Sequence, residues 1–194
     1  RRPPGWRPVA LRGESDAVYA LSRHHLPDEK RAVRNVAAVT AALASIPGVR
    51  VVAPAVDAQV VLLYGTVRRP AALAGVVPSL EAAVSTVSRK VVSGRWRDLE
   101  ATRDGVVLGA ALARALGVDV GARLQAVGAA GGASPLVVVA LVETGLSRID
   151  KTLAMVNLPL AQALAGLADD QATTVRLALV DPLAARDVAR AAAA

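Results

Sequence analysis

Hydrophobic and polar positions follow two patterns along the chain. Short apolar runs bounded by Gly, Pro or Asp are typical of strands, whereas apolar residues three or four positions apart are typical of amphipathic helices. The short runs predict strands at residues 49–52, 58–64, 71–77, 106–108, 124–127, 137–142, 154–158 and 173–180. Helical spacing predicts helices at residues 28–46, 110–116 and 159–164, one from Ser79 and one from residues 181–182. Frequent strands with a few intervening helices indicate an α+β fold.

The first predicted helix has acidic residues at its start. Asp28 and Glu29 suit the partial positive charge of a helix N-terminus, and Pro47 with Gly48 ends the helix. The positions expected to be buried along one face are Val33, Val36, Ala37, Val39 or Thr40, and Leu43. This helix is therefore expected to pack on one side only.

The predicted connections are polar or rich in glycine. Residues 65–70 predict a hairpin-like turn, residues 93–105 a loop, and residues 128–135 a flexible connection between two strands. At the second predicted helix, the Ser79 hydroxyl is expected to cap the N-terminus, with Glu81 in the first turn.

Glycines divide the stretch from residue 105 to residue 124. Gly109 follows an apolar run and opens a helical turn that places Leu112 and Leu116 on one face. Gly117 is expected to stop this helix, because glycine enters the left-handed region without a side-chain clash. Gly121 predicts a second tight turn before the next apolar run.

Four pieces of sequence then arrive in a characteristic order. These are "SIPGVRVVAPAV", "LAGVVPSLEAAVSTVSRKVVSGRWRDL", "VVLGAALARALGVDVGARL" and "VVVALVETGLSRIDKTLAMVNLPLAQAL". The order resembles the extracytoplasmic domain of FtsX/MacB-type ABC transporter permeases over residues 37–181. It is most similar to the lipoprotein-releasing LolC/LolE branch.

The resemblance implies a division of the chain into two parts. Residues 1–62 and 134–194 would form a Porter-like module of βαβ units. Residues 63–133 would form a mostly β, Sabre-like insertion in it. This discontinuous arrangement is implied by the family alone, since composition does not indicate it.

The resemblance also singles out structural positions of the family. In this sequence they are Gly109, Leu116, Gly117, Gly121, Thr144, Gly145, Asp150 and Gln162. For Asp150 two interpretations stay open: a link between the preceding strand and the following helix, or an acid that hydrogen-bonds the backbone of its own turn. We favour the second, and we expect Thr144 and Gln162 to serve packing and turn formation.

A hairpin that contacts partners is implied as well. In the LolC type, a long protruding hairpin recruits the soluble lipoprotein carrier. The matching place here is residues 127–135, with Gly128, Gly131, Gly132 and Pro135 as candidate contact residues. It is short and has no large apolar side chain, which suits a LolE-like partner or a MacB-like exporter at least as well.

The function implied is that of a non-enzymatic domain on the periplasmic face of the bacterial inner membrane. Its partners would be an ABC ATPase subunit and a second permease subunit, and a lipoprotein or a periplasmic carrier is a further candidate. The domain would transmit ATP-driven motion to cargo or an acceptor. Two alternatives are a free periplasmic binding adaptor and, from the enzyme class, a hydrolase or nucleotide-binding domain.

Composition limits the other classes. The chain has 194 residues and a mass of 19.8 kDa, and it is 54% hydrophobic without any Phe, so its core must be aliphatic. The absence of Cys rules out disulfides and thiolate metal sites. No apolar run reaches the about 20 residues that cross a bilayer, and the first residue is Arg, so we expect a soluble fragment of a membrane protein.

Positive charge is the other unusual property. A net charge of +7 and a pI near 10.9 suit phosphate binding, but stacking on single-stranded bases needs several aromatic rings, and aromatics make up 2% of the chain. We therefore expect no nucleic acid partner and interpret arginine as the residue that keeps the chain soluble. Anionic lipid headgroups near a membrane-proximal domain would be a natural neighbour for this charge.

Candidate catalytic groups are few. His24 and His25 are adjacent, so they would point about 100° apart on a helix and to opposite faces of a strand, which disfavours a joint metal site. No Gly-x-Ser-x-Gly elbow is present, and "GAAGGA" lacks the Gly-Lys-Ser/Thr ending of a phosphate loop. Asp169 and Asp170 are expected to form a polar turn. The sequence predicts no catalytic residue, no metal and no cofactor.

Overall fold

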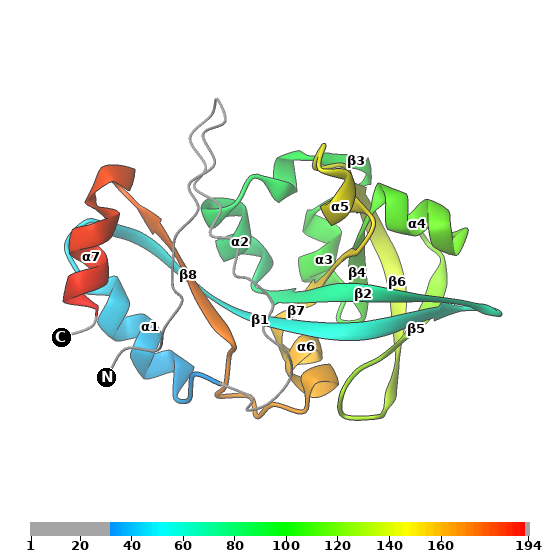
Figure 1. Ribbon diagram of the computed structural model, residues 1–194, viewed down its shortest axis with the longest axis horizontal. Coiled ribbons are helices and arrows are strands. Elements are labelled where there is room, and N and C mark those ends of the chain that lie inside the picture. Colours follow the sequence, from blue (N-terminus) through cyan, green and yellow to red (C-terminus); the bar gives the residue numbers. More distant parts are fainter. Residues whose placement is uncertain (1–31, 193–194) are drawn as a thin grey trace.

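The computed structural model describes residues 32–192 and has a mixed α+β fold, as predicted (Figure 1). The strands are β1 Val49–Tyr64, β2 Val67–Val76, β3 Val91–Gly94, β4 Gly105–Gly109, β5 Arg123–Val127, β6 Ala133–Val142, β7 Leu153–Asn157 and β8 Thr174–Leu179. The α-helices are α1 Val36–Ala44, α2 Pro78–Val84, α3 Arg97–Ala101, α4 Ala110–Leu116, α5 Ser147–Asp150, α6 Leu158–Ala165 and α7 Ala185–Ala191. Two 3₁₀ turns are η1 Val87–Arg89 and η2 Pro182–Ala184.

Six of the strands form a closed ring. Its order is β1, β2, β7, β4, β6 and β5, and β5 pairs with β1 again. The pairs β2–β7 and β4–β6 are parallel, whereas the remaining pairs of the ring are antiparallel. The ring is therefore a small barrel, with β3 added beside the end of β6.

Aliphatic side chains fill the barrel. Each of the six strands contributes inward-facing residues, which alternate with outward-facing ones as the pleat of a strand requires. Those of the ring strands include Val60, Leu62, Ala71, Leu73, Val106, Leu108, Leu124, Ala126, Leu136, Val138, Ala154 and Val156. Helices α4 and α6 add Leu112, Leu116, Ala161 and Leu164 to the same core. Because the chain has no Phe, this core is built from branched aliphatic residues and alanine.

A second, smaller core lies on the outer side of the barrel. Outward-facing residues of β2, β4, β6 and β7 pack there against α3, through the fully buried Leu99. Trp96 packs beside this core, and its Nε1 donates a hydrogen bond to the carbonyl of Pro78, 3.1 Å away. This contact joins the segment before α3 to the start of α2.

Strand β1 leaves the barrel in its first half. Residues 49–55 pair with β8, whereas residues 56–64 pair with β2. Helix α1 packs against β1, α2 packs against both β1 and β8, and α7 follows β8 at the left of Figure 1. Strand β1 thus connects the region of α1 and β8 to the barrel without a break.

This long strand corrects one prediction. The sequence predicts two strands at residues 49–52 and 58–64, but β1 runs without a break because it changes partners midway. The predicted turn at 65–70 is also too long, since β2 begins at Val67 and only two residues separate it from β1. The β1–β2 ladder continues up to Tyr64 and Val67, the residues on either side of the turn, so the strands are longer than predicted.

The predicted helix starts need correction too. Helix α1 begins at Val36 with Asn35 as its cap, and residues 32–35 are not helical, so a helix from residue 28 is wrong; residues 28 and 29 themselves lie outside the described part. Of the expected stripe, Val36 is buried and Ala37 is exposed. Helix α2 begins at Pro78 without a side-chain cap, so Ser79 does not cap it.

Two predicted loops contain regular structure. Residues 93–105 include α3, which forms because Leu99 inserts into the outer core. Residues 133–135 belong to β6, where they pair with β5. The division into 1–62 with 134–194 and 63–133 stays a prediction, and strands of both parts alternate in the barrel.

Candidate functional site

A junction at the ends of β4 and β6 brings predicted positions together. The buried Asp150, at the end of α5, accepts two hydrogen bonds through Oδ1. One comes from the backbone N–H of Thr144 at 2.9 Å and the other from its hydroxyl at 2.8 Å. Thr144 follows β6, so these bonds join the strand to the next helix. Both interpretations of Asp150 stay predictions, since these bonds link α5 to the end of β6 and also lie within the loop that carries Asp150.

Two glycines complete the junction. A Cβ on Gly109 would overlap the backbone carbonyl of Asp150, so only glycine lets the end of β4 approach α5 this closely. Gly145 has a φ of 84°, the left-handed region in which glycine is unstrained. Gly109, Thr144, Gly145 and Asp150 therefore form one structural unit, which we call the α5 junction.

The end of α4 is built as the sequence predicts. Leu116 is buried in the barrel core, and Gly117 caps the helix with a φ of 74°. Gly121 also has a positive φ, and its N–H donates to the carbonyl of Val138 at 2.7 Å. This turn carries the chain from α4 back to the barrel beside β6.

Gln162 holds the connection between α6 and β8. Its buried Nε2 donates to the carbonyls of Asp169 at 2.9 Å and of Gln171 at 2.8 Å. Asp169 and Asp170 lie on an exposed turn, as predicted. The amide of Gln162 thus satisfies two backbone acceptors that a packing residue without polar atoms would leave unpaired.

The predicted contact hairpin lies between β5 and β6. A Cβ on Gly128 would overlap the carbonyl of Leu164, so the hairpin starts against the end of α6. Gly131 and Gly132 are exposed, and a Cβ on either would meet nothing within 4 Å. Pro135 is an exposed residue of β6. The four residues share one hairpin, and no large apolar side chain stands at its tip.

A shallow hollow lies beside this hairpin, and the sequence did not reveal it. Its volume is about 420 Å³, and its lining includes Tyr64, Arg123, Gln125 and Pro135. It forms where the tip of the β1–β2 hairpin passes β5. The sequence gives one sign of this hollow, the aromatic Tyr64 directly before Gly65 at a predicted turn.

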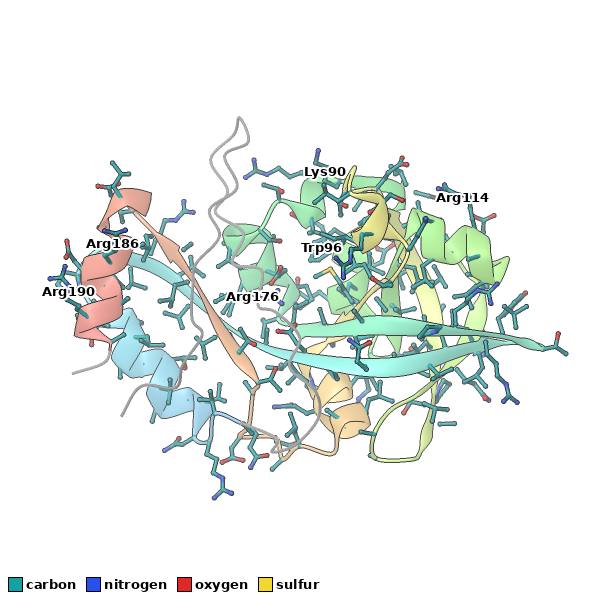
Figure 2. All side chains as sticks on the ribbon, viewed as in Figure 1. Lys90, Trp96, Arg114, Arg176, Arg186 and Arg190 are labelled. Carbon is teal, nitrogen blue, oxygen red and sulfur yellow. The ribbon has the colours of Figure 1, made fainter. Side chains whose placement is uncertain are left out.

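A buried ion pair was also missed. Arg176 of β8 donates through Nη1 to Glu81 Oε2 at 2.9 Å and through Nη2 to Asp57 Oδ1 at 3.1 Å. The side chain of Glu81 is only 3% exposed, and Figure 2 shows Arg176 next to α2. The guanidinium therefore connects β8, α2 and β1. The sequence places Glu81 in a helix start but gives no sign of a partner 95 residues away.

Two further features are absent from residues 32–192. Within residues 32–192, no group of three or more His, Asp or Glu side chains is arranged to hold a metal ion. His24 and His25 lie outside that range. No helix between residues 32 and 192 has the length and apolar character needed to cross a bilayer.

Comparison with known sequences gives the family. Residues 11–194 match the MacB-like periplasmic core domain. The chain is 32% identical over 144 residues to the lipoprotein-releasing system transmembrane protein LolC of Neisseria meningitidis serogroup B, covering 70% of this chain and 34% of that protein. It is 35% identical over 153 residues to LolC of Xylella fastidiosa strain 9a5c, covering 74% and 36%. The chain spans about a third of the length of these relatives.

Solved structures agree on the fold. The extracellular domain of the noncanonic ABC-type transporter YknZ from Gram-positive bacteria superposes with a TM-score of 0.65 at 16% identity, over 85% of this chain and 82% of that one. The periplasmic region of MacB from Actinobacillus actinomycetemcomitans gives 0.56 at 14% identity, over 81% and 73%. The predicted resemblance and the periplasmic placement are confirmed by the family match. This chain belongs to the family of MacB-like periplasmic core domains.

Proposed function

We propose that the chain is the periplasmic domain of a LolC-like ABC transporter permease that takes part in lipoprotein release. A separate ATPase subunit would drive the movement, a second permease subunit would share it, and this domain would pass it to cargo or to a periplasmic acceptor. The observation that carries the proposal is the identity of 32–35% to LolC proteins of two genera over 70–74% of the chain.

The geometry supports a mechanical role. Movement passed between two sites needs an element that does not deform between them. Strand β1 runs from the part of the chain near α1 and α7 into the barrel without interruption, and Arg176 ties β8 to both β1 and α2. A displacement applied to β8 would therefore move the barrel as one body.

The contact with a carrier is the less supported half of the proposal. The β5–β6 hairpin is short, and its exposed residues include Gly131 and Gly132, which offer no side chain for a pocket. A LolE-like or MacB-like role accommodates such a hairpin as well as a LolC-like role does. In a MacB-like exporter the domain would transmit motion without receiving a lipoprotein.

A domain exchange tests the proposal. The region of Neisseria meningitidis LolC that matches this chain is replaced by the chain, and the complex is reconstituted with its ATPase and second permease subunit in proteoliposomes. We expect ATP-dependent transfer of a fluorescent lipoprotein from the membrane to soluble carrier. An ATPase variant that binds but does not hydrolyse ATP is the control and should release none.

The same exchange separates the alternatives. If the hybrid hydrolyses ATP but releases no lipoprotein, and a matched hybrid of MacB is active in export, the MacB-like alternative replaces the proposal. If the purified chain alone turns over a substrate, the proposal of a non-enzymatic domain is wrong.

A further inference from the structure

Leu146 is an exposed leucine on a fixed backbone. Its side chain is 56% exposed. Its N–H donates to Thr144 Oγ1 at 3.2 Å, and its carbonyl accepts from the N–H groups of Ile149 at 2.8 Å and Asp150 at 3.0 Å. The α5 junction therefore holds both polar groups of the Leu146 backbone. Binding a partner at this position would require little further ordering of the loop.

Four cationic residues belong to the segments next to this leucine. Arg148 and Lys151 belong to α5 and its C-cap, and the N–H of Glu143 donates to the carbonyl of Lys90 at 2.9 Å, which places η1 with Arg89 beside the same loop. All four cations are exposed. In the described part of the chain, none of these four side chains forms an ion pair. The acidic residue Glu143 lies next to Lys90.

A second apolar side chain lies on the neighbouring edge strand. Val92 of β3 is 57% exposed, at the point where the pairing of β3 with β6 shifts register. Figure 1 places β3 and α5 together at one edge of the molecule, and Figure 2 shows Lys90 at that edge. We call the set Arg89, Lys90, Val92, Leu146, Arg148 and Lys151 the α5 surface. Apolar residues with a charged rim are the usual composition of an interaction patch.

We propose that the α5 surface docks an acidic, amphipathic protein segment, with apolar side chains on Leu146 and Val92 and carboxylates facing the four cations. Charge complementarity favours an acidic partner over a second copy of this chain, because the α5 surface of a second copy would bring its own cations against these four. This proposal does not depend on what the transporter carries.

Binding of defined peptides to the full chain tests the proposal. The probe is a fluorescein-labelled peptide of glutamates with leucines at helical spacing, measured by fluorescence anisotropy. Two comparison peptides have the leucines dispersed or lysine in place of glutamate. The variants are Leu146→Ser, Val92→Ser and the double change of Arg148 and Lys151 to Gln. The control is Leu183→Ser, because Leu183 is 91% exposed and followed by Arg186 at another edge.

We expect the glutamate-leucine peptide to bind, and its affinity to fall about tenfold with Leu146→Ser or with the double change. Affinity should decrease from 50 to 300 mM salt and stay unchanged with Leu183→Ser. Equal effects of Leu146→Ser and Leu183→Ser, or equal affinity for the dispersed or lysine peptide, would overturn the proposal. So would the absence of peptide binding together with Leu146-dependent binding to phosphatidylglycerol vesicles, which would identify a lipid surface instead.

Discussion

Asp150 is the residue on which the α5 junction depends. Replacing it with Ala leaves the half-buried N–H and hydroxyl of Thr144 without their acceptor. An unpaired buried donor costs about 1 to 3 kcal/mol, so we expect Asp150→Ala to lower the free energy of unfolding by about 2 kcal/mol. Asp150→Asn keeps an acceptor oxygen and should cost less. Urea unfolding measures both, and equal losses for Ala and Asn would show that the acceptor is not what matters.

Gly109 tests the close approach of β4 to α5. A methyl group there would overlap the carbonyl of Asp150, and the strand and helix would have to separate. Overpacking of this kind costs about 1 to 3 kcal/mol, so Gly109→Ala should lower the melting temperature clearly. Gly132→Ala is the matched control, since a Cβ there meets nothing within 4 Å. If the two variants have the same melting temperature, the contact between Gly109 and Asp150 has no energetic role.

The sequence identified local residue roles better than distant ones. Gly117 and Gly121 were predicted correctly, because a glycine after a helical stripe requires only neighbours in the chain to interpret. For Asp150 the sequence leaves two interpretations open, since a turn acid has several donors within reach. The contact of Arg176 with Glu81 was not predicted at all, because nothing local distinguishes a buried glutamate from a solvated one in a first helical turn.

At the scale of elements, position was easier to predict than extent. The strands at residues 106–108 and 124–127 and the helix at 110–116 lie where the apolar pattern places them. β1 was divided in two because the pattern shows burial and not pairing, and its pairing partner changes midway. Helix α3 was missed because a single buried residue, Leu99, fixes a polar segment.

Arg176 connects three elements, and its removal should loosen them together. Arg176→Ala leaves the carboxylate of Glu81 buried without a cation. Breaking a buried pair costs about 3 to 5 kcal/mol; the Arg176 side chain is 30% exposed, so we expect about 3 kcal/mol by urea unfolding. Arg190→Ala removes an ion pair whose side chains are 80% and 76% exposed, and it should change stability by less than about 1 kcal/mol.

A second variant separates charge from packing in this ion pair. If the loss comes from the uncompensated carboxylate, adding Glu81→Leu to Arg176→Met should recover most of it, because no buried charge is then left. A double variant that stays as unstable as Arg176→Met alone would mean that the ion pair itself holds α2. Hydrogen exchange of β8 amides would report which of the two holds.

The whole molecule shows an arrangement that no local pattern contains. Closure of the barrel depends on β1 meeting both β2 and β5, and on parallel pairing between strands far apart in sequence. The α+β class follows from the alternation of elements, but the order of strands does not. Residues 63–133 contribute β2, β4 and β5 to the ring, and residues 134–194 contribute β6 and β7.

Because strands of both parts alternate around one ring, neither part has a complete core of its own. We therefore expect residues 63–133, expressed alone, to give the circular dichroism spectrum of an unfolded chain. The intact chain should unfold in one transition, with amides of β5 and β6 exchanging at the same free energy, since each strand completes the other's ladder. A folded spectrum for the isolated segment, or two separate exchange free energies, would mean that the insertion is an independent domain and that the barrel closes only after both parts have formed.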